Sequence, residues 1–235
     1  MVAKKSKSEL CKEDRVRIYF KDKLDAILEK NILVAGCGSL GSSLTLQLAS
    51  CGFKKFILVD FDLVEKRNLS TQQYFLSQLG TYKVDALKEI LEKKFEKISC
   101  KAVKVNLNEK NVEEIIKKAD VVVDGLDNFA TRFALSDACR KLKIPYIFAA
   151  CAGSFGITGV FYPSGICLRC FLKDKQNWLS CAEVGVAPQT VAITASLESM
   201  QVIYCLLGVK QPFYYFDLNQ KTIDKLKLSR TKCKC

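Results

Sequence analysis

The amino-acid sequence predicts an α/β fold, a mostly parallel sheet with helices on both faces that is extended by antiparallel strands in the C-terminal part. Short runs of consecutive apolar residues alternate with helical patterns as far as residue 150. Runs that are apolar throughout are typical of parallel strands buried on both faces. After residue 150, closely spaced glycines divide the chain into short runs, as hairpin strands do.

Composition indicates one globular unit. Of the 235 residues, 49% are hydrophobic and 26% are charged, which excludes disorder and allows a sizeable core. We expect a single domain over 1–235, with an N-terminal helical arm over 1–30. A first half over 31–150 and a second half over 151–235 follow this arm.

The elements of the first half follow from their own patterns. The run from Asn31 to Gly36 is apolar and ends in glycines, which predicts a strand. Leu40, Leu44 and Leu48 stand at helical spacing, which predicts a helix over Ser39 to Cys51. Further strands are expected at 55–60, 101–105, 120–124 and 145–150, and a further helix at 82–95.

The second half is expected to continue the sheet. Hairpin strands are predicted at 157–162 and in the segment that enters Cys167. Residues 174–186 lack periodicity, which predicts a mobile loop. The apolar stretch 191–209 is interrupted by polar residues, so we expect a buried core helix there and no membrane span.

The charge balance favours acidic or phosphorylated partners. Lys and Arg number 37 against 25 Asp and Glu, a net charge of +12, and there is no histidine. Histidine acid–base chemistry and histidine metal ligands are therefore excluded, and a metal site must use cysteine or carboxylate. No apolar run follows the lysines of the first ten residues, so we expect a cytoplasmic protein whose twelve cysteines stay reduced.

A glycine motif marks the candidate nucleotide site. Gly36-Cys-Gly38-Ser-Leu-Gly41 follows a predicted strand and opens a predicted helix, where backbone N–H groups bind phosphate. Asp60 ends the next strand about 20 residues later, where a carboxylate accepts hydrogen bonds from ribose hydroxyls. The sheet is therefore Rossmann-like, and NAD and ATP fit this motif equally well.

Several spaced motifs after Asp60 resemble one family. They are Asp60-Phe-Asp62-Leu-Val, Asn68-Leu-Ser-Thr-Gln72, Gly80-Thr-Tyr-Lys83 and Asp124-Gly-Leu-Asp127-Asn-Phe-Ala-Thr-Arg132. In these residues the chain resembles the ThiF/MoeB/HesA family, adenylyltransferases related to ubiquitin-activating enzymes. The resemblance runs from about Arg15 to Cys235 and implies a site for ATP instead of NAD.

The resemblance implies a role for each matched residue. Asp60 would bind the ribose, Asn68 and Gln72 the nucleotide and its phosphates, Lys83 the phosphates, and Asp127 a magnesium ion. Attack of a carboxylate on an α-phosphate needs cations where negative charges converge, and hydride transfer needs neither a lysine nor a metal here.

Two positions near these motifs bear on the phosphate contacts. Thr71 stands where the family has an arginine, so that contact is missing or is replaced by Lys66 or Arg67. The segment Arg15-Val-Arg17 resembles a family segment whose second arginine reaches the nucleotide of the neighbouring subunit. The match implies that Arg17 completes the site of a homodimer.

Five cysteines are candidates for metal binding or covalent chemistry. Cys167-Leu-Arg-Cys170 and Cys233-Lys-Cys235 fit a tetrahedral zinc site, with four unliganded thiols as the alternative. The second family pair is normally C-x-x-C, so Cys235 departs from the pattern by one residue. Cys181 lies in the predicted mobile loop, and the resemblance implies a thioester or acyl disulfide there, with a cysteine of no catalytic consequence as the alternative.

The function that the sequence favours is ATP-dependent activation of the C-terminal Gly-Gly carboxylate of a small ubiquitin-like sulfur-carrier protein, of the ThiS or MoaD type, with release of pyrophosphate. The second half of the chain would dock this carrier, and a separate protein would be a possible sulfur donor. Three alternatives stay open: activation of a carboxylate on a modified tRNA nucleoside, as in threonylcarbamoyladenosine dehydratase; an NAD-dependent oxidoreductase; and a non-catalytic binding module. Thiamin, molybdenum-cofactor, tRNA-thiolation and cysteine pathways all fit the resemblance.

Overall fold

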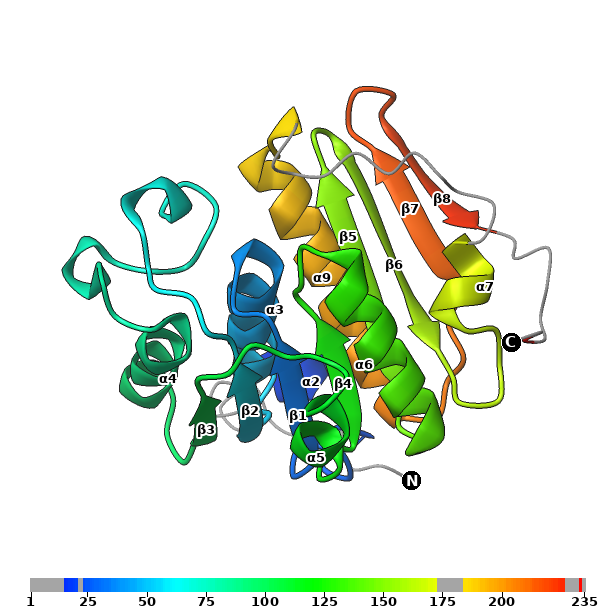
Figure 1. Cartoon of the computed structure of the whole chain (residues 1–235), viewed down its shortest axis with the longest axis horizontal. Helices are drawn as coiled ribbons and strands as arrows, with labels where there is room; N and C mark the ends of the chain where they lie inside the picture. Colours follow the sequence, from blue (N-terminus) through cyan, green and yellow to red (C-terminus); the bar gives the residue numbers. More distant parts are fainter. Residues whose placement is uncertain (1–14, 21–22, 173–183, 227–232, 234–235) are drawn as a thin grey trace.

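One sheet with a parallel and an antiparallel half runs through the computed structural model, which describes residues 15–20, 23–172, 184–226 and 233 (Figure 1). The eight strands of this part lie in the order β3-β2-β1-β4-β5-β6-β7-β8. Neighbours from β3 to β5 are parallel, and those from β5 to β8 are antiparallel, which confirms the predicted fold class. The strands are β1 (Asn31–Ala35), β2 (Lys55–Val59), β3 (Ser99–Val103), β4 (Val121–Asp124), β5 (Tyr146–Ala152), β6 (Phe155–Phe161), β7 (Phe213–Asp217) and β8 (Thr222–Leu226).

Helices cover both faces of the sheet and enclose two apolar cores (Figure 1). One core packs the sheet against α3 (Ser39–Ser50), α4 (Lys83–Lys94) and α9 (Pro188–Leu206). The other packs it against α5 (Val112–Ile116), α6 (Phe129–Lys141) and α7 (Leu168–Leu172). Three further elements belong to the described part: α2 (Arg15–Phe20) and the 3₁₀ helices η2 (Lys66–Asn68) and η3 (Leu76–Gln78).

The continuous apolar runs of the parallel strands have a direct structural cause. Successive side chains of a strand point to opposite faces of the sheet. In β1, Ile32 belongs to one core and Leu33 to the other, and both side chains are fully buried. Because both faces are covered, every position along such a strand needs a side chain that tolerates burial.

The structure corrects three expectations of the sequence. The strands predicted at 101–105 and 157–162 are β3 and β6, and each begins two residues earlier, at Ser99 and at Phe155. The segment that enters Cys167 is no hairpin strand: the helix α7 follows Cys167 instead, because Leu168 and Phe171 share one helical side that packs into the core. The hairpin partners of β6 are β5 and β7, the latter from the tail.

Parts of the predicted arm and loop are fixed to the sheet. Leu24 and Ile27, before β1, are buried in the core that contains α3. Of the predicted mobile loop 174–186, residues 174–183 lie outside the described part of the chain. At its end Val186 forms a bridge with Gly153, and the backbone N–H of Gly153 donates to the carbonyl of Gly185 at 2.8 Å.

The stretch predicted as a core helix forms α9, which Pro188 begins. It packs against β5 and β6 and buries polar side chains as well as apolar ones, including Thr194, Glu198 and Gln201. Among the described residues, no helix combines the length and the hydrophobicity that a membrane crossing requires.

Candidate functional site

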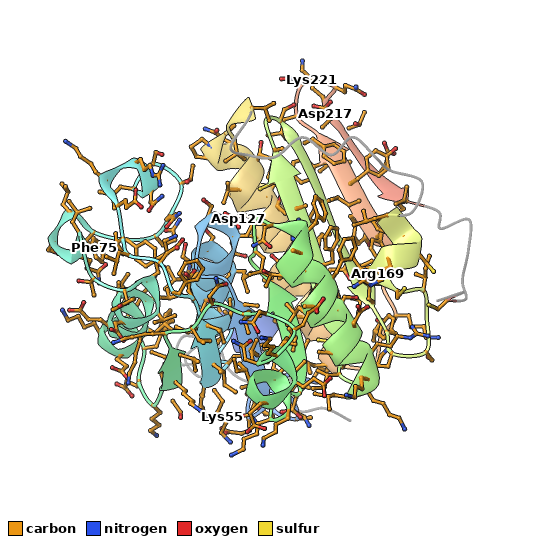
Figure 2. All side chains as sticks on the ribbon, viewed as in Figure 1. Lys55, Phe75, Asp127, Arg169, Asp217 and Lys221 are labelled. Carbon is orange, nitrogen blue, oxygen red and sulfur yellow. The ribbon has the colours of Figure 1, made fainter. Side chains whose placement is uncertain are left out.

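The candidate nucleotide site lies where the sheet reverses its strand order, at the carboxyl ends of β1, β2 and β4. The chain leaves β1 toward β2 on one side and returns to β4 on the other, and ligands of doubly wound sheets bind at such a point. Figure 2 shows Asp127 at this end of the sheet. The glycine loop, the turn after Asp60 and the loop that carries Asp127 all begin here.

Glycines allow the first and third of these loops to touch. Gly36 has a φ of +90°, and a Cβ on it would lie 2.5 Å from the carbonyl oxygen of Gly125. A Cβ on Gly41 would lie 1.9 Å from the carbonyl oxygen of Gly36. Gly38 precedes α3 and offers no side-chain cap, so the first N–H groups of the helix face the loop without a side-chain acceptor.

Asp60 joins the end of β2 to the glycine loop. One of its carboxylate oxygens accepts from the backbone N–H of Cys37 at 2.7 Å, and the other accepts from Asp62 at 2.8 Å. Burial raises the pKa of Asp60, and these two hydrogen bonds and nearby Lys83 oppose that shift. Each carboxylate oxygen has a second lone pair, so ribose hydroxyls still have acceptors here.

Lys83 is a buried cation, not a solvated residue at a helix start. It begins α4, is 6% exposed, and its Nζ lies 2.7 Å from a carboxylate oxygen of Asp62. The side chain of Asp62 is 48% exposed, so the pair stands at the border of the site. A buried ammonium group needs such a partner, and it has three donors, of which Asp62 occupies one.

The segment of Asn68 to Gln72 lies beside the glycine loop. The side-chain oxygen Oε1 of Gln72 is buried without a hydrogen-bond partner among the described residues, and a Cβ on Gly38 would lie 4.0 Å from Gln72 Nε2. Asn68 Oδ1 accepts from the backbone N–H of Glu65 at 3.1 Å, and this hydrogen bond does not use the Asn68 Nδ2 group. Gln72 therefore contributes a buried side-chain oxygen that no described residue satisfies.

Thr71, which stands where the family has an arginine, pairs its hydroxyl group with that of Ser39. Ser39 Oγ donates to Thr71 Oγ1 at 2.8 Å, at the start of α3. Arg67 does not take this place, because its Nε lies 2.6 Å from Glu65 and its side chain is 80% exposed. Lys66 is exposed and stands beside Arg67 in η2.

Asp127 is exposed in the loop between β4 and α6. The next residue, Asn128, caps α6 by accepting from the backbone N–H of Thr131 at 2.9 Å, and its Nδ2 donates to Asp127 at 3.4 Å. An exposed carboxylate at the open end of the sheet suits a hard cation such as Mg²⁺.

Sequence reasoning placed Asp124 and Arg132 in one family motif but gave them no role, and it missed the buried polar network that they form beneath this loop. Asp124 is fully buried and pairs with Arg132, whose Nε lies 3.1 Å from Asp124 Oδ2. The hydroxyl of Tyr146 donates to Asp124 at 2.6 Å. Burial raises the pKa of Asp124, and the positive charge of Arg132 opposes this shift. Burial alone would lower the pKa of Arg132, but the negative charge of Asp124 outweighs burial, so the pKa of Arg132 is raised. The sequence signal was the motif from Asp124 to Arg132, which contains both residues of the ion pair.

A second buried carboxyl group stands close to this network. Glu198 of α9 is fully buried, and neither of its oxygens forms a hydrogen bond of normal geometry with a described residue. Burial raises the pKa of Glu198 well above its usual range, and the charge of Asp124 adds to this effect. The backbone of Asp124 and the guanidinium of Arg132 oppose the shift without cancelling it. Burial of Glu198 therefore favours its neutral form.

Replacing Glu198 by glutamine should stabilise the protein, and by more at high pH. A carboxyl group whose pKa is raised in the folded state stabilises the fold below its unfolded pKa, near 4.5, and loses that contribution as pH rises toward the folded value. We expect the free energy of unfolding in urea to rise by roughly 1–3 kcal/mol at alkaline pH and by less in mild acid. Exposed Glu96→Gln is the control, and an equal effect of Glu198→Gln at both pH values would contradict this account.

A cysteine cluster forms a separate candidate site at α7 and the tail. The three sulfur atoms of Cys167, Cys170 and Cys233 all lie within 4.8 Å of one another, and Cys233 Sγ is 3.3 Å from Cys167 Sγ. The backbone N–H of Cys170 points to Cys167 Sγ at 3.4 Å. Three of the four predicted zinc ligands are thus together, and the fourth, Cys235, lies outside the described residues.

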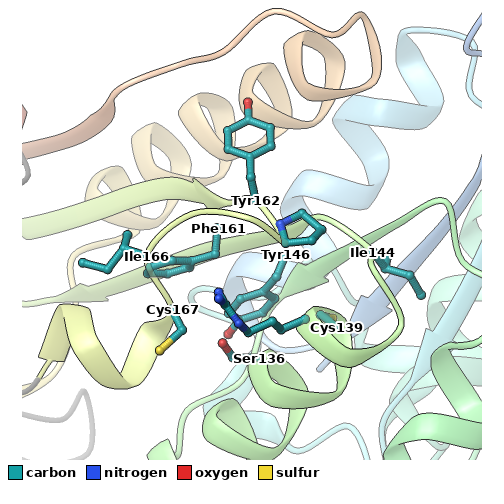
Figure 3. Close-up of a pocket in the computed structure, with 10 residues that line it drawn as sticks. Ser136, Cys139, Ile144, Tyr146, Phe161, Tyr162, Ile166 and Cys167 are labelled. Carbon is teal, nitrogen blue, oxygen red and sulfur yellow. The ribbon is translucent and has the colours of Figure 1, made fainter. Parts of the chain in front are cut away.

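A pocket beside this cluster is too small for a substrate. It lies between α6, β5, β6 and the segment before α7, and its lining includes Cys139, Tyr146 and Cys167 (Figure 3). Its volume of about 10 Å³ accommodates one water molecule at most. The cluster is therefore a candidate for structural metal binding and not the floor of a reaction chamber.

Two predicted catalytic residues are not placed by the structure. Cys181 lies outside the described part of the chain. Arg17 falls within the helix α2, whose backbone is described, but its side chain is not. The roles predicted for both residues stay predictions.

The fold and the site define the class of Rossmann-like nucleotide-binding proteins, with a glycine loop at the switch point and a carboxylate after the neighbouring strand. Within this class, the model of the ThiF family matches residues 12–235, and the chain belongs to this family.

Named relatives of the chain include several adenylyltransferases. It is 30% identical over 214 residues to the adenylyltransferase and sulfurtransferase MOCS3 of Culex quinquefasciatus, across 87% of this chain and 49% of that protein. It is 31% identical over 195 residues to the molybdopterin-synthase adenylyltransferase of Escherichia coli K12, across 81% of this chain and 78% of that protein. The sulfur carrier protein ThiS adenylyltransferase of the same organism is 30% identical over 190 residues, across 79% of this chain and 76% of that protein.

The chain spans about half the length of the MOCS3 relatives that it matches. A similar solved structure is the microcin C7 biosynthetic enzyme MccB in complex with N-formylated MccA, at a TM-score of 0.79 and 20% identity. This likeness covers 95% of the present chain and 74% of that one. At that identity it supports the fold alone.

Proposed function

We propose that this chain is an ATP-dependent adenylyltransferase that activates the C-terminal carboxylate of a small ubiquitin-like sulfur-carrier protein. The observation that carries the proposal is the meeting of an uncapped helix start, a buried lysine and an exposed carboxylate at one end of the sheet. Membership of the ThiF family and the names of its relatives supply the reaction class and the kind of partner.

The reaction would join the carrier carboxylate to AMP. A carboxylate oxygen of the carrier attacks the α-phosphorus of ATP, the bond to the bridging oxygen breaks, and pyrophosphate leaves with the electron pair. The backbone N–H groups at the start of α3 and the two remaining donors of Lys83 would neutralise the phosphate oxygens. Magnesium held by Asp127 would add positive charge and orient the leaving group.

Asp60 and Gln72 would orient the nucleoside part. The two oxygens of Asp60 are fixed by backbone N–H groups and keep lone pairs for ribose hydroxyls. Gln72 would satisfy its buried Oε1 with a donor from the ligand. Asn68, four residues before Gln72, would donate to the nucleotide through its Nδ2 group, which the hydrogen bond with Glu65 does not use.

Exchange of radioactive pyrophosphate into ATP tests the proposed function. We expect exchange to depend on a carrier that ends in Gly-Gly and to disappear when its last glycine is removed. Cofactor titration should give binding of Mg·ATP and no binding of NAD. Carrier-independent NAD binding without exchange would overturn the proposal, and adenylation of a modified tRNA instead of any carrier would replace it with the tRNA alternative.

We infer that the active unit is a homodimer with composite sites. The connection from β2 to α4 exposes six large apolar side chains, an area that a second copy would cover: Phe61, Leu63, Phe75, Leu76, Leu79 and Tyr82. Arg17 of one copy would reach the nucleotide of the other. Mixing inactive Arg17→Ala protein with inactive Asp127→Asn protein should then restore exchange, because mixed dimers contain one intact site. If the mixed dimers form and pyrophosphate exchange does not recover, the sites are not composite.

Cys181 is proposed as the residue that forms a covalent adduct with the activated carrier. Attack of its thiolate on the carrier adenylate would form a thioester and release AMP. Alternatively, a separate persulfide donor would transfer its outer sulfur to Cys181 and keep its own thiol. The Cys181 persulfide would then attack the adenylate, which gives an acyl disulfide and releases AMP. Cys181→Ala should retain exchange and lose a carrier adduct that thiol reagents cleave. Absence of the adduct in the unsubstituted protein would leave sulfur transfer to a separate protein.

A further inference from the structure

A buried guanidinium group holds the loop that precedes Asp127. Arg132 of α6 is 5% exposed, and it pairs with fully buried Asp124. Its Nη2 donates to the carbonyl oxygens of Leu126 and Ala149, the latter at 2.9 Å. The guanidinium also stands over the ring of Phe148, 5.3 Å from the ring centre.

These contacts take the place of a strand ladder. The register of β4 with β5 ends at Val123 and Ile147, so the chain beyond Val123 has no further ladder partner on that side. Arg132 spans this gap by binding one carbonyl on the loop and one on β5. The planar fork of arginine suits this arrangement, and a lysine ammonium does not reproduce it.

The ion pair binds both polar backbone atoms of one residue. Asp124 Oδ1 accepts from the backbone N–H of Leu126 at 2.9 Å, while Arg132 donates to the carbonyl oxygen of the same residue. On the other side of Asp127, Asn128 is fixed as the cap of α6. Both neighbours of Asp127 are thus held, although Asp127 itself is exposed.

We propose that Arg132 is a positioning residue for Asp127: together with Asp124 and Tyr146, it fixes the loop so that the Asp127 carboxylate meets the metal of bound Mg·ATP. The inference rests on the proposed function, because it concerns the metal in that site. A purely structural ion pair would stabilise the fold without positioning the Asp127 carboxylate for the metal. The two roles therefore differ in whether the effect of Arg132 passes through Asp127.

A double-mutant cycle separates the two roles. Arg132→Lys should weaken the binding of Mg·ATP in calorimetry by about tenfold, as other supports of metal ligands do. It should change the binding of metal-free ATP by much less. In an Asp127→Asn background the same substitution should have no further effect on Mg·ATP, because the group that it positions is gone.

Arg140→Lys provides the matched control. Arg140 lies on the same helix and donates to the carbonyl of Gly165 at 2.9 Å, away from the loop. It should leave Mg·ATP binding and amide hydrogen exchange of residues 124–128 unchanged, whereas Arg132→Lys should accelerate that exchange.

The possible results distinguish failure of the positioning role from failure of the proposed function. Equal losses from Arg132→Lys with and without Asp127 would overturn the positioning role, as would unchanged amide hydrogen exchange at residues 124–128 in Arg132→Lys protein. Protein that binds Mg·ATP normally but adenylates no carrier would overturn the proposed function while the cycle still decides the role of Arg132. Unsubstituted protein that binds no Mg·ATP would overturn both.

Discussion

Replacing Asp127 by asparagine should abolish pyrophosphate exchange while the protein stays folded. The substitution removes the negative charge that would hold Mg²⁺, and the exposed side chain carries no part of either core. Losses of about a hundredfold or more are typical when charge stabilisation at a transferring group is removed. Exchange is measured at saturating carrier and over a range of Mg²⁺ concentrations, with the thermal unfolding midpoint as the test of folding.

Asp137→Asn is the control for this substitution. Asp137 also lies on the α6 side of the sheet, but its carboxylate pairs with Arg169 at 2.8 Å, on the exposed surface. Pairs of this kind contribute little to stability. We expect exchange in Asp137→Asn protein to equal that of the unsubstituted protein. Undiminished exchange in Asp127→Asn protein would remove Asp127 from the mechanism.

Protein purified under reducing conditions without chelators should contain about one Zn²⁺ per chain, and Cys170→Ser should release it. The three sulfur atoms already lie within one coordination sphere, and zinc would join α7 to the end of the chain. Structural zinc contributes roughly 10–16 kcal/mol in small zinc domains. Here the sheet has two apolar cores of its own, so we expect only a fraction of that loss, seen as a lower unfolding midpoint.

Cys139→Ser separates metal binding from packing. Cys139 is 1% exposed and lines the same pocket as Cys167, but it does not belong to the group of three sulfur atoms. Its loss should lower stability without changing the zinc content measured by elemental analysis. A Cys170→Ser protein that keeps its zinc, or unsubstituted protein that contains none, would contradict the metal site.

Local patterns predicted the parallel half of the fold well. Two elements could be predicted from local pattern alone: β1 from its apolar run, and α3 from the spacing of Leu40, Leu44 and Leu48. Helix periodicity and strand burial both repeat within a few residues, so a short segment shows them. The glycine loop was equally readable. Gly36 has a φ of +90° and packs on Gly125, so a side chain does not fit there. The glycine in the motif therefore indicates this close contact.

The antiparallel half was predicted only in outline. Phe155 of β6 pairs with Asp217 of β7, across more than sixty residues of chain, and no pattern near either residue identifies its partner. The segment after Cys167 has apolar residues that fit a short strand or a short helix. Helix α7 prevails because Phe171 packs against Phe161 and Phe213, which the fold brings together.

The sequence by itself determined the fold class, the glycine loop and the family, because each depends on residue types at short, fixed spacings. Tertiary structure alone decided which charges are buried and what they face. Lys83 is a helix-entry lysine in the sequence, and the fold makes it a buried cation beside Asp62. Arg132 stands in a family motif, but only the fold shows that it is buried and donates to the carbonyl oxygen of Ala149 in β5. Burial and pairing arise from contacts between distant segments, so local periodicity carries no record of them.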